Sequence, residues 1–131
     1  RHGATVSSLA SISVDPPLVT VTLAKGTRTH QMMLIAGVFG VTILSLKQQS
    51  LAERFSGMVA EDQDRFDGIQ YTYLPDQIPV LDGGLAAFGC RIVHVYEMKN
   101  STLFVGEVMS SQLGDDQSPL VYVNRMYRKL E

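Results

Sequence analysis

The stretch TVSSLASISVDPPLVTVTLAKGTRTH, residues 5–30, sets the expectation for the whole fold. Its segment LVTVTL alternates valine and leucine with threonine, which predicts a strand with one buried face. The two prolines at 16–17 separate this strand from the serine-rich, β-branched run before it. We therefore expect two strands, at residues 3–14 and 18–23, followed by a short basic loop rich in glycine and threonine.

The rest of the chain predicts more strands and two short helices. Met32 to Ala36 fit a helix that Gly37 ends, and Ser45 with Gln48 forms a capping box in front of a second helix. Residues 58–84 read mostly as loop. Further strands are expected at residues 39–44, 69–73, 85–97, 102–113 and 120–127, with the turn MKNS joining the two longest. The pattern is typical of a small, mainly β barrel with short helices, and requires no parallel sheet.

Composition limits what such a chain does. Its 131 residues are the size of one domain, so residues 1–131 are expected to form a single core. No apolar run approaches the roughly 18 residues that span a bilayer, and a net charge of −2 without a basic stripe argues against nucleic acid as the partner. Cys90 is the only cysteine and the three histidines are scattered, so we expect no metal site and a reducing, cytoplasmic location.

The loop AKGTRTH has the residue types of a phosphate site. Gly26 frees the backbone, and a helix is expected to begin directly after the loop, where the first main-chain N–H groups have no acceptor within the helix. Charge and hydroxyl donors come from Lys25, Arg28, Thr27 and Thr29. A generic polar loop of the same composition is the alternative interpretation.

The serine-rich strand is the second candidate. A planar heterocycle with polar edges is bound well by main-chain groups along a strand whose small side chains allow a close approach. TVSSLAS is small and polar in this way, although a solvent-facing strand that tolerates serine would look the same.

Together these segments resemble the flavin reductase-like family, the FMN-binding split barrels that act as NAD(P)H:flavin oxidoreductases beside two-component monooxygenases. The likeness includes the Asp15-Pro16-Pro17 break and continues in order through FGVTILSLKQQSLAERFSG, DRFDGIQY, PVLDGGLAAFGCRIVHVYE, STLFVGEV and PLVYVNRMYRKL. It implies a split β-barrel of Greek-key type. The helix and strand with which the family usually begins have no counterpart before the serine-rich strand here.

The resemblance also implies which residues hold the flavin. Those expected on the isoalloxazine and ribityl side are Thr5, Val6, Ser7, Ser8 and Ser11. Those expected at the phosphate are Lys25, Gly26, Thr27, Arg28 and Thr29, and Arg54 and Phe55 match a position that borders the flavin. Ser101 replaces a turn histidine that many members place near the nicotinamide. Arg125 and Tyr127 are a further aromatic and cationic pair that would either meet the dinucleotide or cap the barrel.

The function implied is that of a flavin reductase, in which hydride passes from nicotinamide C4 to flavin N5 and reduced flavin goes to a separate monooxygenase. No catalytic side chain is expected, since the cofactors carry the chemistry. FMN or FAD and NADH or NADPH all remain open, and the resemblance implies a homodimer. Because Ser101 replaces the histidine, an FMN-binding electron carrier or storage protein with little NAD(P)H oxidation is the alternative. A β-barrel interaction module without ligand is a third possibility.

Overall fold

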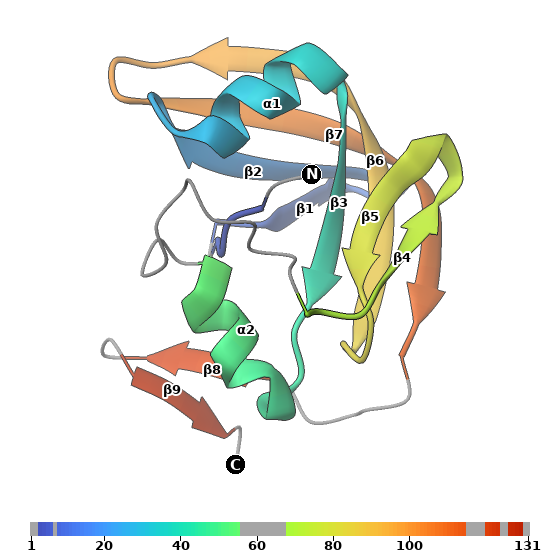
Figure 1. The fold of residues 1–131 in the computed structure, drawn as a ribbon. Helices are drawn as coiled ribbons and strands as arrows, with labels where there is room; N and C mark the ends of the chain where they lie inside the picture. Colours follow the sequence, from blue (N-terminus) through green and yellow to red (C-terminus); the bar gives the residue numbers. More distant parts are fainter. Residues whose placement is uncertain (1–2, 7, 56–67, 115–119, 124–125, 130–131) are drawn as a thin grey trace.

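A five-stranded antiparallel sheet is the main element of the computed structural model, which describes residues 3–6, 8–55, 68–114, 120–123 and 126–129. The strands follow the order β1-β2-β7-β6-β3 (Figure 1), with bounds β1 (Ala10–Ser13), β2 (Leu18–Ala24), β3 (Val38–Ile43), β6 (Ala86–Glu97) and β7 (Ser101–Leu113). Two antiparallel pairs complete the β structure: β4 (Tyr71–Leu74) with β5 (Ile78–Leu81), and β8 (Leu120–Val123) with β9 (Met126–Lys129). The mainly β, antiparallel fold predicted from sequence is thus confirmed.

Two helices were predicted and both form. In α1 (Arg28–Ala36), Thr27 is the N-cap, and Gly37 ends the helix in the left-handed conformation with φ +74°, donating its N–H to Met33 O over 3.0 Å. The second helix begins as a 3-10 turn, Leu46–Gln48, which precedes α2 (Gln49–Glu53). Gln48 Oε1 accepts the Ser45 N–H at 3.0 Å, as in the expected capping box. Gly57, which stands in the sequence where a glycine would end this helix, lies outside the described residues.

Three strand predictions were wrong. Of the described residues before Ala10, namely 3–6, 8 and 9, none joins the ladder, and Ala10–Ser13 pair as β1. The strand β5 was missed within the predicted loop, because Pro79 lies inside it and Pro75 shortly before it. Asp76 and Gln77 turn the chain in front of the strand with φ of +65° and +58°. The last predicted strand is two strands, β8 and β9, which satisfy each other's main-chain groups by antiparallel pairing.

Close packing across the sheet explains two glycines. At Gly40 in β3, an added Cβ would lie 2.6 Å from the Pro79 carbonyl oxygen of β5, so glycine lets the β4–β5 hairpin approach β3. At Gly106 in β7, a Cβ would lie 2.6 Å from Phe39 Cζ. The aromatic ring of Phe39 therefore occupies the space that a side chain at position 106 would need.

The core lies between α1 and the face of the sheet that it covers (Figure 1). Its buried members are Val19, Val21, Leu23, Met33, Phe39, Cys90 and Phe104. The valines and the leucine of β2 are the apolar positions of the LVTVTL alternation, so the predicted buried face is confirmed.

Cys90 is a fully buried free thiol within this core. Burial raises its pKa from 9.0 to about 12, because the thiolate would lose its hydration. At neutral pH the residue is therefore a small apolar side chain, as its apolar surroundings in the sequence predict.

None of the helices among the described residues has the length and hydropathy that a membrane-spanning helix requires.

Candidate flavin site

Ser8 joins the serine-rich segment to β2 through its side chain. Thr22 N donates to Ser8 Oγ at 3.0 Å, and Ser8 Oγ donates to Thr22 O at 3.3 Å. These bonds continue the register in which Ala10 pairs with Thr20, but with a hydroxyl in place of a main-chain group. Because a side chain makes these bonds, the segment before residue 10 is not a regular strand, contrary to the prediction. The same bonds keep Ser8 alongside β2, near the end of β2 that leads into the basic loop.

Thr5 attaches the same segment to the end of α2. Its N–H donates to Phe55 O at 2.7 Å, and its hydroxyl donates to Ala52 O at 2.6 Å. The predicted residues Thr5 and Phe55 are therefore brought together although they stand fifty residues apart in sequence. Phe55 is buried and Val6 is exposed, whereas Ser7 lies outside the described residues. Ser11 lies within β1, and its side chain is exposed.

The basic loop turns at Gly26, whose φ is +86° and whose added Cβ would meet nothing within 4 Å. The Thr27 hydroxyl forms hydrogen bonds to residues before and after the loop. It donates to Ala24 O at 3.0 Å and accepts from His30 N at 3.3 Å. This hydroxyl thus serves the fold as a helix cap. Arg28 is exposed and Thr29 is partly exposed at the first two positions of α1, where main-chain N–H groups have no acceptor within the helix.

The β6–β7 hairpin lies beside this loop. Ser101 pairs with Ala24 in the ladder, and Lys25 N donates to Asn100 O at 2.9 Å. The Lys25 ammonium lies 3.6 Å from Glu97 Oε1, an exposed ion pair that contributes little to stability. Ser101, predicted on the nicotinamide side, is thus adjacent to the predicted phosphate loop.

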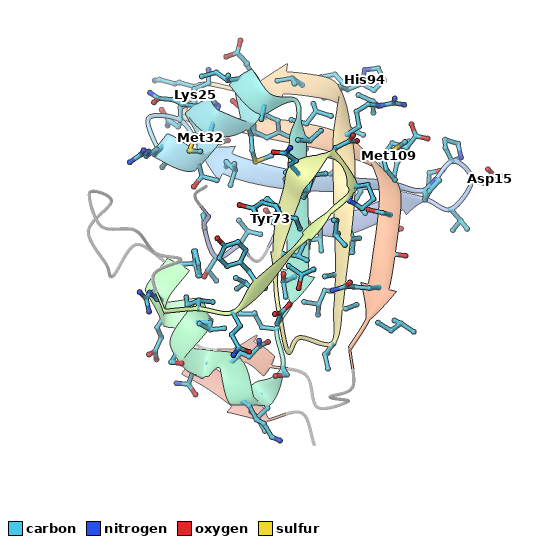
Figure 2. The ribbon with its side chains drawn as sticks, turned by 45° about the vertical axis from the view of Figure 1, so that its right-hand side comes forward. Asp15, Lys25, Met32, Tyr73, His94 and Met109 are labelled. Carbon is cyan, nitrogen blue, oxygen red and sulfur yellow. The ribbon has the colours of Figure 1, made fainter. Side chains whose placement is uncertain are left out.

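The structure does not describe the side chains of the other two residues predicted near the nicotinamide. Arg125 lies outside the described residues, and Tyr127 belongs to β9, where only the backbone is described. Figure 2 shows Lys25 beside the start of α1 and Asp15 at the far end of the sheet, so the basic loop and the β1–β2 turn lie at opposite ends of β2.

The donor set around the loop fits a phosphate group. Two cationic side chains, Lys25 and Arg28, stand at the N-terminus of a nine-residue helix, whose macrodipole and first N–H groups favour an anion. Gly26 leaves the approach open. In the part of the chain that the structure describes, no group of three or more His, Cys, Asp or Glu gathers.

Comparison with known proteins gives the class. The model of the flavin reductase like domain matches residues 1–131, and the chain belongs to this family. Among curated proteins it is 32% identical to the NADH-dependent flavin reductase of Rhodococcus sp, covering 99% of this chain and 70% of that protein. It is also 32% identical to the reductase component of the FADH(2)-dependent resorcinol hydroxylase of Rhizobium sp. (strain MTP-10005), covering 96% of this chain and 70% of that protein.

Solved structures agree with this assignment. The NADH:FAD oxidoreductase SgcE6 of Streptomyces globisporus C-1027 superposes with a TM-score of 0.92 at 26% identity, covering 99% of this chain and 78% of that one. A nitrilotriacetate monooxygenase component B homolog from Mycobacterium thermoresistibile gives a TM-score of 0.91 at 30% identity, covering 99% and 72%. SgcE6 has also been solved in complex with NAD and FAD fragments. These likenesses confirm the predicted family and fold class.

Proposed function

We propose that this chain is a flavin reductase that uses NADH to reduce FMN or FAD. The observation that carries the proposal is the match of the whole chain to the flavin reductase like domain. Relatives named as NADH-dependent flavin reductase and FMN reductase (NADH) support NADH as the reductant, and the FADH(2)-dependent relative supports FAD as an alternative acceptor. The basic loop follows β2, the strand on which Ser8 is held, and supplies donors suited to the flavin nucleotide.

In this proposal the residues of the chain bind the flavin and the nicotinamide and orient them relative to each other. The segment 5–8, held on β2 by Ser8 and on α2 by Thr5, lines the ring and ribityl side, with Arg54, Phe55 and Ser11 at its border. The loop 25–29 holds the phosphate with main-chain N–H groups and the cations Lys25 and Arg28. When bound, the flavin and the nicotinamide would themselves supply the chemistry of hydride transfer. Since that step needs no protein acid or base, the fold contributes proximity and orientation, and the hairpin at Ser101 borders the nicotinamide.

The alternative, a flavin carrier or storage protein, is less well supported. Its sequence basis was Ser101 in place of a histidine, yet the relatives that match nearly the whole chain are named as reductases or reductase components. Steady-state oxidation of NADH and NADPH with added FMN, FAD or riboflavin tests the choice. We expect NADH consumption that depends on flavin. Tightly bound yellow flavin without nucleotide consumption would instead establish the carrier, and a protein that stays colourless after FMN is added would exclude both.

A separate monooxygenase is the proposed consumer of the reduced flavin. Several relatives are named as reductase components or subunits of such systems, which supports this partner class. A cytoplasmic location belongs to the same proposal, since the one cysteine is a buried free thiol and the chemistry needs no disulfide.

We also propose a homodimer. Val93 and Val95 of β6 are exposed at 37% and 41%, and exposed apolar side chains are common where subunits meet. Sedimentation velocity at several protein concentrations is expected to show a dimer. A species of one chain's mass across the whole concentration range would exclude it.

A further inference from the structure

His30 and Thr102 form a buried polar pair that the proposed function does not use. His30, the third residue of α1, is 6% exposed, and Thr102, the second residue of β7, is fully buried. His30 Nε2 lies 2.7 Å from Thr102 Oγ1, and the imidazole meets the Phe104 ring edge-on with ring centroids 5.7 Å apart. An imidazole is costly to bury without a partner, so a residue needed only to fill this space would be apolar.

The pair connects the two loops of the candidate site. His30 follows the loop 25–29 directly, and its N–H is accepted by Thr27, the residue that caps the helix. Thr102 follows Ser101, the first residue of β7, whose carbonyl accepts the Met98 N–H at 2.8 Å across the hairpin turn. A side-chain bond inside the core therefore holds the start of α1 to the base of the β6–β7 hairpin, below the main-chain bond from Lys25 to Asn100.

We propose that the His30–Thr102 pair is a positioning device that fixes the basic loop 25–29 relative to the hairpin 98–101. This inference builds on the proposed function, in which the loop holds the flavin phosphate and the hairpin borders the nicotinamide. In the proposed function NADH binds between the hairpin and a flavin whose phosphate the loop holds. A shift of the hairpin relative to the loop would weaken the contacts that NADH makes equally in the ground state and the transition state, which raises the KM more than it lowers kcat. A buried bond that joins both loops keeps their relative position constant.

Thr102→Val is the direct test, because valine keeps the shape and removes the hydroxyl. We expect the KM for NADH, measured at saturating flavin, to rise about 5- to 20-fold while kcat changes much less, as for a lost binding geometry. Thr102→Ser keeps the hydroxyl and is expected to restore the KM to within about threefold of the original protein. His30→Leu, which removes the other partner, is expected to raise the KM as Thr102→Val does.

Thr42→Val is the matched control. Thr42 Oγ1 accepts the Leu81 N–H at 2.9 Å and so joins β3 to β5, in another part of the fold. Its loss is expected to lower the thermal midpoint without changing the KM. If Thr102→Val and His30→Leu lower the thermal midpoint but leave the KM unchanged, the pair is ordinary packing and the proposal is overturned.

Hydrogen exchange separates this proposal from the proposed function. In Thr102→Val, or in His30→Leu if the valine variant does not fold, amide exchange should rise in residues 25–30 and 98–102 together while exchange in β3 stays constant. If the original protein oxidises no NADH, the proposed function has failed and exchange alone decides. No joint rise in the two segments would then overturn the positioning role.

Discussion

Arg28→Ala is expected to weaken FMN binding by about 10- to 100-fold, the loss that follows when a charge-assisted hydrogen bond to phosphate is removed. Arg28 is exposed at the first position of α1, beside the first main-chain N–H groups, so the substitution leaves the helix cap at Thr27 and the core intact. Quenching of flavin fluorescence on titration with protein measures the dissociation constant.

Two comparisons make this result specific. Riboflavin lacks the phosphate, so its dissociation constant is expected to be the same for Arg28→Ala and the original protein. Arg91→Ala removes another exposed arginine, one that lies 3.2 Å from Glu107 on the neighbouring strand, and is expected to leave FMN binding unchanged. Equal weakening of FMN and riboflavin, or no weakening of FMN, would show that Arg28 does not hold the phosphate.

Phe104→Ala is expected to lower the free energy of unfolding by about 3–5 kcal/mol, the usual loss when a large aromatic side chain is removed from a core. Phe104 is fully buried at the centre of the sheet, with Val21 opposite it on β2, and its ring also contacts His30. Chemical denaturation followed by circular dichroism gives the free energy. Because domains are typically stable by only about 5–15 kcal/mol, much of the protein's stability depends on this ring.

An exposed aromatic residue provides the control. Tyr73 in β4 is 54% exposed and makes an edge-on contact with Tyr71, so Tyr73→Ala is expected to cost about 1 kcal/mol or less. A similar loss for the two variants would mean that the core is not centred on Phe104.

The sequence allows the residues of the candidate site to be predicted, but not the hydrogen bonds that join them to distant parts of the chain. The basic loop is contiguous in sequence, so its charges, glycine and helix-capping threonine are visible without a structure. Its neighbours are not, because Thr5 bonds to Ala52 across 47 residues and His30 bonds to Thr102 across 72. A local sequence pattern does not predict which distant carbonyl or hydroxyl group forms a hydrogen bond with a given side chain. Cys90, in contrast, stands in the apolar stretch FGCRIV, a local pattern that agrees with its complete burial.

The sequence by itself determined the buried face of β2, the helix α1 with its terminal glycine, and the two long strands β6 and β7, because their signals are local and periodic. Only the tertiary structure decided that Ser8 replaces a main-chain partner on Thr22, that β5 forms where two prolines indicate a loop, and that the last segment divides into β8 and β9. Each of these depends on hydrogen-bonding groups supplied by another part of the chain. Buried main-chain N–H and C=O groups must be hydrogen-bonded, and the groups that can satisfy them are known only once the whole chain has folded.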